Sequence, residues 1–156
     1  MQVLVFELDR NRYGLDTACI RRVLPLLEMK QLAHAPPFVA GLMNYHGAPV
    51  PVIDLSLING GRGCSACFDT RILVVDFTTK EGTVHALGLI AERVSTVTKI
   101  VRDGLVDPGV ECAGGPYLGQ VVAQEDGILQ LIELSQLLTD EVRAVLFQPA
   151  GQTGPC

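Results

Sequence analysis

GLMNYHGAPVPVIDL, the stretch from Gly41 to Leu55, decides the fold. Two apolar runs flank a break at His46-Gly47, where glycine accepts backbone angles that other residues resist. Pro49 and Pro51 cannot donate backbone hydrogen bonds, so the second run is typical of an edge strand and not of a central one. Asp54 is a preferred N-cap residue and predicts a short helical turn directly after it. The stretch therefore predicts a rigid hairpin with an exposed tip.

The chain on either side of this hairpin alternates short apolar runs with turns, which is typical of β-strands. A helical turn is expected at residues 18–22, and a turn at residues 38–40 that feeds the hairpin. One longer helix is predicted over residues 133–147, with its apolar side chains on one face and Ser135 as its N-cap. The many short strands predict an all-β protein built from barrels. The patterns place extended segments at residues 2–8, 13–15, 23–31, 71–77, 84–90, 93–101, 117–123 and 128–132.

Composition excludes several classes of function. Of the 156 residues, 48% are hydrophobic and 19% charged, so the chain can bury a sizeable core and is not disordered. The net charge is −5 and no basic run is present, which argues against binding to nucleic acid or to anionic membranes. No apolar stretch approaches the ~18 residues that span a bilayer, and no signal-peptide pattern is visible. We therefore expect a cytoplasmic protein without membrane insertion.

The five cysteines offer the sharpest chemical motif, Cys64-x-x-Cys67. A redox-active pair of this kind sits at a helix N-terminus after a strand, and a structural zinc site needs four ligands. Here the pair lies in a glycine-rich loop of a β protein. Cys112, His34 and His85 are the available further ligands, and no second paired motif exists. Free loop thiols are favoured over a metal or redox site, and no cofactor is expected.

No catalytic set accompanies these residues. The histidines lack a nucleophile motif such as G-x-S-x-G, and the glycines near residue 60 lack the Gly-Lys-Ser/Thr of a phosphate-binding loop. Exposed sheet edges and apolar turns are what interaction modules use to recruit partners. A binding module is therefore favoured over an enzyme.

Four motifs follow one another in a specific order. The pattern F-x-L…Y-G-L spans residues 6–15, and A-P-x-F-V-x-G-x-x-N-x-R-G-x-x-x-P-V-x-D-L is matched over residues 35–55 except at its arginine. A version of G-L-x-V-D-x-V occupies residues 88–94, and one of L-L-x-I-x-x-L-L occupies residues 128–138. Each motif alone is weak. In this order, over nearly the whole chain, they resemble the CheW-like family of chemotaxis coupling proteins.

This resemblance implies two SH3-like five-stranded β-barrels that share a hydrophobic core, with a C-terminal helix and no catalysis. Residues 1–147 would form a single domain of two intertwined barrels, and residues 148–156 a flexible tail. The family links chemoreceptors to a histidine kinase. The implied partners are the regulatory domain of a CheA-type kinase, bound through one barrel, and the cytoplasmic tip of a methyl-accepting chemoreceptor, bound near the groove between the barrels. The protein would then be recruited to membrane receptor arrays.

Two charged positions depart from the family pattern. His46 stands where an arginine is usual, and Arg22 stands where the segment V-x-E-V has an acidic residue. A protonated His46 would repel Arg22, which reverses the charge pairing that the family residues allow. We therefore expect a divergent coupling protein whose partner carries a matched, more acidic surface. The candidate partner-binding residues are Ile20, Arg22, Asn44, Tyr45, His46, Gly47 and Glu92.

Two other functions remain open. The chain could be a CheW-like regulatory module of a pathway outside chemotaxis, such as surface sensing or pilus motility. It could also be a redox- or metal-responsive protein that uses Cys64 and Cys67. Thiol titration with metal analysis separates the last function from an adaptor.

Overall fold

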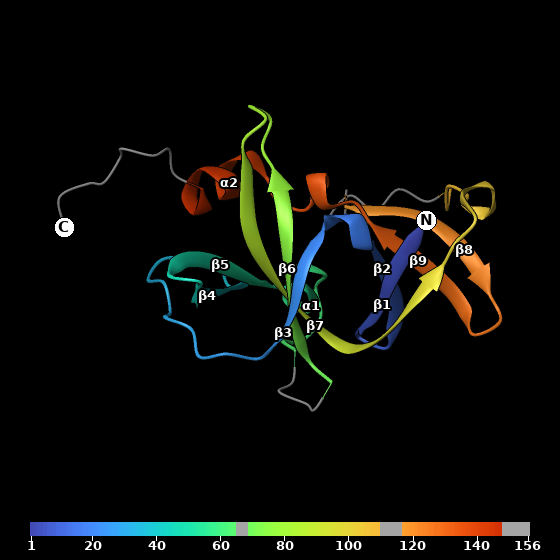
Figure 1. Ribbon diagram of the computed structural model, residues 1–156, viewed down its shortest axis with the longest axis horizontal. Helices are drawn as coiled ribbons and strands as arrows, with labels where there is room; N and C mark the ends of the chain where they lie inside the picture. The colour runs from blue at the N-terminus through green and yellow to red at the C-terminus, as the bar shows by residue number, and fades with distance from the viewer. Residues whose placement is uncertain (65–68, 110–116, 148–156) are drawn as a thin grey trace.

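The computed structural model describes residues 1–64, 69–109 and 117–147 (Figure 1). Within them the chain forms nine strands, two short α-helices and three 3₁₀ turns. The strands are β1 (Gln2–Leu8), β2 (Asn11–Asp16), β3 (Ile20–Pro25), β4 (Val39–Tyr45), β5 (Ala48–Asp54), β6 (Arg71–Thr78), β7 (Val84–Lys99), β8 (Leu118–Gln124) and β9 (Gly127–Ile132). The helices are α1 (Leu55–Ile58) and α2 (Asp140–Leu146).

The strands form two five-stranded barrels that share β7 (Figure 1). Barrel A contains β1, β2, β8, β9 and the second half of β7, and barrel B contains β3, β4, β5, β6 and the first half of β7. Ala91 of β7 still pairs with β6 in barrel B, whereas Glu92 pairs with Glu7 of β1 in barrel A. A register shift and a left-handed φ of 47° at Arg93 mark the crossing. One 16-residue strand therefore belongs to both barrels.

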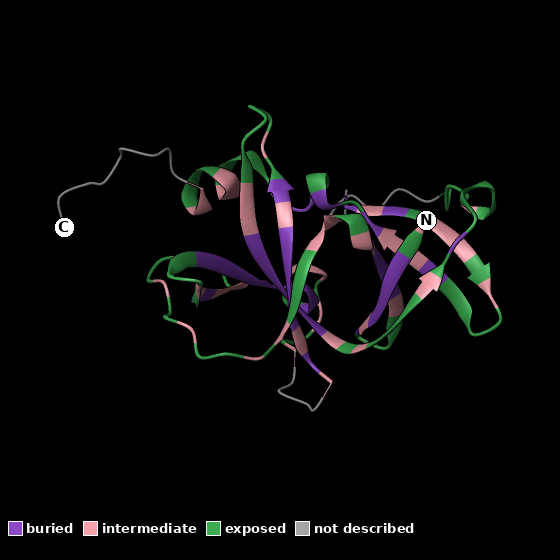
Figure 2. Ribbon diagram, in the orientation of Figure 1, coloured by how far each residue is buried: buried purple, intermediate pink, exposed green. Residues whose placement is uncertain are grey.

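Three clusters of buried side chains fill these barrels, and the central strands carry most of the buried positions (Figure 2). The largest cluster joins the barrels: Phe6 and Leu8 of barrel A lie in it together with Leu73 and Leu89 of barrel B. Met43, Val50, Val52, Ile72, Val74 and Ile90 fill the interior of barrel B, and Val3, Val5, Ile100 and Leu129 fill that of barrel A. The predicted pair of SH3-like barrels on a shared hydrophobic core is thereby confirmed.

The two strands expected at residues 84–90 and 93–101 are one strand, β7. Glu92 and Arg93 interrupt the alternation of apolar and polar residues, and this interruption resembles a strand end in the sequence. In the structure it is the irregularity at which β7 leaves one barrel and enters the other. Between the pairs Glu7–Glu92 and Val5–Thr96, β7 advances four residues while β1 advances two, so the irregularity inserts extra residues without ending the strand.

The predicted C-terminal helix is present, but it does not extend over residues 133–147 as expected. A 3₁₀ turn at Leu134–Gln136 precedes α2, which begins at Asp140. Thr139 caps α2 in place of Ser135, because its Oγ1 accepts a hydrogen bond from the Val142 amide. Acidic residues in the first turn also favour a helix start at this point. No helix in the part of the chain that the structure describes has the length and apolar character to cross a membrane.

The early segments also differ from the prediction. The helical turn is shorter than expected and spans Thr17–Cys19, with the Asp16 carboxylate as its cap. β3 begins at Ile20 because pairing with β6 draws this residue into the sheet, and it ends at Pro25. The strand was expected to extend to residue 31, but beyond Pro25 only an isolated β-bridge between Lys30 and Leu42 is present. The turn expected at residues 38–40 is largely the start of β4, which begins at Val39. Sheet pairing overrides local propensity here.

The edge-strand prediction for the second run of the hairpin is half right. Pro49 and Pro51 lie where β5 has only β4 as its neighbour. From Val52 to Asp54, β5 also pairs in parallel with β7. The prolines therefore mark where the second neighbour is missing, and β5 becomes a central strand after them.

Candidate protein-interaction sites

The link between β4 and β5 forms a rigid tip, which we define as residues Asn44 to Gly47. The Asn44 side chain accepts a hydrogen bond of 2.8 Å from the Gly47 amide. His46 and Gly47 both adopt left-handed backbone angles, with φ of 52° and 84°. The His46 ring lies edge-on to the Tyr45 ring, with 4.4 Å between their centroids. The exposed His46 side chain is therefore presented on a fixed backbone.

Ile20 and Arg22 lie on β3, opposite Val75 and Val74 of β6. Ile20 is half-buried and packs against the shared core, whereas Arg22 is exposed. The neighbouring Arg21 forms an ion pair with Asp76. No such ion pair neutralises Arg22 within the described residues. Its positive charge is therefore free to attract an acidic group of a partner.

Glu92 lies far from the tip. β5 and β7 run parallel with Asp54 beside Ile90, so Glu92 lies beyond the end of β5, while the tip precedes its start. Strands rise about 3.3 Å per residue, so on the order of 20 Å separates Glu92 from the tip. The predicted residues therefore do not form one patch. They divide into the tip, the pair on β3, and Glu92.

Glu92 lines a polar hollow of about 500 Å³ at the point where β7 crosses between the barrels. Arg93 Nε and Glu7 Oε2 form an ion pair of 3.3 Å at its edge. Carboxylates and guanidinium groups line it in equal numbers, so the hollow has no strong net charge. Its lining residues are Glu7, Asp9, Arg10, Ser56, Arg62, Gly63, Glu92 and Arg93.

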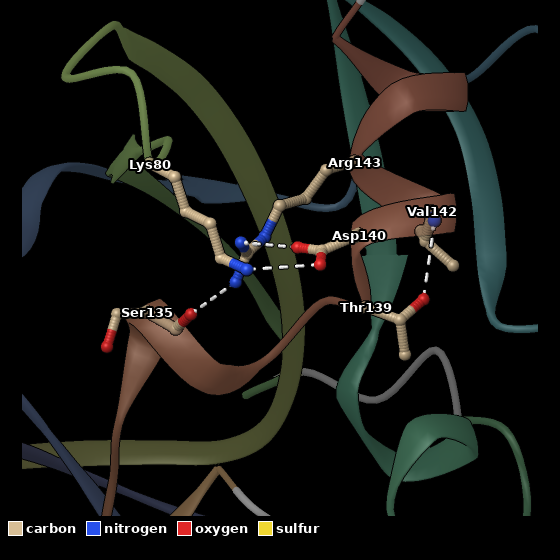
Figure 3. Close-up of polar contacts among 6 residues, drawn as sticks. All are labelled: Lys80, Ser135, Thr139, Asp140, Val142 and Arg143. Carbon is tan, nitrogen blue, oxygen red and sulfur yellow. Dashed lines mark hydrogen bonds and ion pairs between the residues drawn. The ribbon is translucent and has the colours of Figure 1, made fainter.

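A larger hollow of about 900 Å³ lies beside α2 and is bordered by Phe38, α1 and Tyr117. Figure 3 shows the polar contacts on its rim: Asp140 lies 3.0 Å from Lys80 Nζ and 3.1 Å from Arg143 Nη1. Arg143 also donates to the Ser135 carbonyl oxygen. The Lys80 ammonium group, followed by Arg143, lowers the pKa of Asp140. The Lys80–Asp140 ion pair links α2 to the turn between β6 and β7, and sequence patterns do not point to it because the two residues are 60 positions apart.

Sequence patterns also do not single out Val97. It is opposite Leu4 in the pairing of β7 with β1, so its side chain shares the face of a residue in the shared core. Nevertheless Val97 is 54% exposed. Directly opposite residues of an antiparallel pair point to the same face of the sheet. Val97 therefore offers an exposed apolar side chain on the sheet face that it shares with Leu4.

Cys64 is held in a structural role. Its amide donates a hydrogen bond of 2.9 Å to Asp54 Oδ2, and its Sγ lies 3.6 Å from the Ile90 carbonyl oxygen. Burial, followed by the negative charge of Asp54, raises the pKa of the Cys64 thiol far above its ordinary value of 9.0. The thiol therefore stays protonated at neutral pH, which argues against a reactive pair. Cys67 lies outside the described residues, within which no three His, Cys, Asp or Glu side chains gather as a metal site.

We predict that Cys64 reacts with iodoacetamide much more slowly in the folded protein than in urea, because thiolates are the reacting species. The pKa of Cys64 is higher in the folded than in the unfolded chain. Its contribution to the free energy of unfolding is therefore fully present below about pH 9 and is lost as the pH rises further. Mass spectrometry of the alkylated peptide at several pH values measures the rate. Equal rates for folded and unfolded chains would contradict the prediction.

Comparisons with known proteins agree with this geometry. Residues 2–142 match the model of the CheW-like domain. The chain is 26% identical over 148 residues to the chemotaxis protein CheW of Klebsiella aerogenes, covering 93% of this chain and 86% of that protein. It is 22% identical over 145 residues to the chemotaxis protein CheW of Rhizobium meliloti, covering 91% and 90%. The crystal structure of the scaffolding protein TtCheW from Thermoanaerobacter tengcongensis superposes with a TM-score of 0.78 at 24% identity, covering 90% of this chain and 89% of that chain. The chain therefore belongs to the CheW-like family, whose members are non-enzymatic scaffold proteins.

Proposed function

We propose that this protein is a cytoplasmic adaptor that couples chemoreceptors to a CheA-type histidine kinase. The observation that carries the proposal is the family match over residues 2–142, together with relatives that are named as chemotaxis proteins. The adaptor would act at membrane receptor arrays through protein contacts alone. Residues 1–147 would work as one domain, because the shared strand β7 and the shared core leave neither barrel complete by itself.

The two implied partners would use different parts of the surface. The regulatory domain of the kinase would bind exposed residues of one barrel. The cytoplasmic tip of a receptor would dock at the junction of the barrels. Ile20 supports this assignment, since it packs against the shared core and is partly exposed. The exposed Val97 shares a sheet face with Leu4, a residue of that core.

The charges of Arg22 and His46 support a partner whose binding surface is more acidic than is usual for the family. Arg22 is exposed and has no ion pair among the described residues, whereas Arg21 is neutralised by Asp76. His46 adds a titratable group in place of a permanent charge. A negatively charged partner would be attracted to Arg22, and a partner with a basic group at that position would be repelled.

Binding measurements test the proposal. A chemotaxis kinase and a receptor from the same genome should co-purify with the wild-type chain. Co-purification of a kinase from a surface-sensing or pilus pathway would assign the protein to that pathway instead. For an ordinary chemoreceptor tip, the double variant Arg22→Glu with His46→Arg should gain about tenfold in affinity over the wild type. Arg102→Glu, in the exposed 3₁₀ turn Arg102–Gly104 after β7, is the control, because it makes the same charge change as Arg22→Glu at another place. The charge argument fails if the double variant gains no affinity.

A further inference from the structure

A short chain of hydrogen bonds joins the two barrels through Asn59. Its Nδ2 donates to the Tyr13 hydroxyl over 3.1 Å, and its Oδ1 accepts from the Tyr117 hydroxyl over 2.7 Å. The Tyr117 hydroxyl also lies 3.4 Å from the carbonyl oxygen of Ile58. Tyr13 lies on β2 of barrel A, and Tyr117 directly precedes β8 of the same barrel. Asn59 follows α1, whose chain continues from β5 of barrel B.

The surroundings of this network are apolar. Tyr13 and Tyr117 are only 6% and 4% exposed and belong to the shared core. Apolar side chains pack without directional preference, so they alone permit two barrels to rotate slightly against each other. Hydrogen bonds have fixed distances and angles, and they are strengthened in surroundings of low polarity. A rotation of the barrels would break these bonds and leave buried polar groups unpaired.

The strand that connects the barrels contains a point at which they can rotate. β7 crosses between them at Glu92 and Arg93, where the pairing with β1 shifts register and Arg93 has a left-handed backbone angle. On one side of this point the pairing of β7 with β6 ends at Ala91, and on the other side its regular pairing with β1 begins at Thr96. The crossing alone therefore does not determine the angle between the barrels.

Asn59 is also linked to the tip. β5 begins at the tip and ends at Asp54, whose carboxylate accepts hydrogen bonds from the amides of Ser56 and Leu57 in the first turn of α1. The Asn59 amide donates to the Leu55 carbonyl oxygen over 3.0 Å and completes that turn. The tip, β5 and α1 are therefore one rigid element of barrel B, and the Asn59 side chain connects its end to barrel A.

We propose that Asn59 is a positioning residue that fixes the angle between the two barrels, and thereby the shape of the junction at which a receptor tip docks. The docking part rests on the proposed function. A partner that binds both barrels at their junction depends on this angle. A partner that binds one barrel does not.

Residual dipolar couplings of the backbone amides in the full chain measure the angle directly. In the wild type, both barrels should report one common alignment tensor. In Asn59→Ala the tensors of the two barrels should diverge, and Tyr117→Phe, which keeps the ring and removes the hydroxyl, should show a smaller divergence. Ile72→Val is the control, since it loosens the interior of barrel B without touching the network. Identical tensors for both barrels in Asn59→Ala would overturn the proposal.

Binding of a receptor tip and of the kinase regulatory domain gives the second readout. In Asn59→Ala, the affinity for the receptor tip should fall about tenfold, and that for the kinase domain should change by no more than about twofold. Equal losses for both partners, or an unchanged receptor affinity, would overturn the positioning of the docking junction. If the wild type binds neither partner, the proposed function fails, and the dipolar couplings still decide whether Asn59 sets the angle.

Discussion

Replacing Gly41 with alanine is expected to lower the free energy of unfolding by roughly 3 kcal/mol or more. Gly41 has φ of 149°, a backbone conformation that residues with a side chain rarely adopt. A Cβ at this position would lie 2.4 Å from the carbonyl oxygen of Lys30. That carbonyl group cannot move away, because Lys30 and Leu42 exchange two backbone hydrogen bonds of 2.8 Å each. The substitution therefore combines backbone strain with a clash against fixed backbone.

Urea unfolding of the wild type and of Gly41→Ala measures this loss. Gly47→Ala is the matched control, since Gly47 also has a positive φ but its Cβ would meet nothing within 4 Å. Backbone strain without a clash should cost Gly47→Ala about 1 kcal/mol. Equal losses in the two variants would show that the Lys30 carbonyl group does not restrict Gly41.

Phe6→Ala is expected to cost about 3–5 kcal/mol, because it leaves a large cavity in the shared core. Phe6 has no exposed surface, and its ring stacks on Tyr13 with 6.5 Å between the centroids. The shared core contains residues of both barrels, so the cavity should destabilise both at once. We therefore expect one cooperative transition at a lower urea concentration, with both barrels unfolding together.

Amide signals from each barrel, followed by NMR through the urea transition, measure this result. Ile128→Ala is the control, because Ile128 is 65% exposed on β9, and its loss should change stability by no more than about 0.5 kcal/mol. If Phe6→Ala shifts the transition of barrel A and leaves that of barrel B in place, the core does not couple the barrels.

The parts of the fold that local chemistry specifies could be predicted from the sequence. The hairpin from Gly41 to Leu55 contains its own turn, its own strand breaks and its own helix cap, and each of these acts over a few residues. Asp54 caps α1 as its residue type predicts. The β8–β9 hairpin likewise follows from the turn residues ahead of Gly127. In each case the residues that decide the structure are neighbours in the chain.

The features that sequence patterns miss depend on contacts between distant residues. The crossing of β7 resembles two strands, because only the pairing partners show that the strand continues. The side chains of Tyr13 and Asn59 meet across 46 residues, and those of Lys80 and Asp140 across 60. For the partner-binding residues, sequence similarity indicates which positions matter. It does not indicate that Glu92 and His46 lie at opposite ends of β5.

The pairing of β2 with β9 determines when barrel A can close during synthesis. β2 pairs in parallel with β9, through Arg12 with Leu129, so barrel A needs both ends of the chain. The strands of barrel B all lie between residues 20 and 91, and they are synthesised before β8 and β9. At a synthesis rate of about 5–20 residues per second, β2 lacks its neighbour β9 for several seconds. We therefore expect the β1–β2 hairpin to keep an open edge during synthesis, with which other chains can pair until β9 has been made.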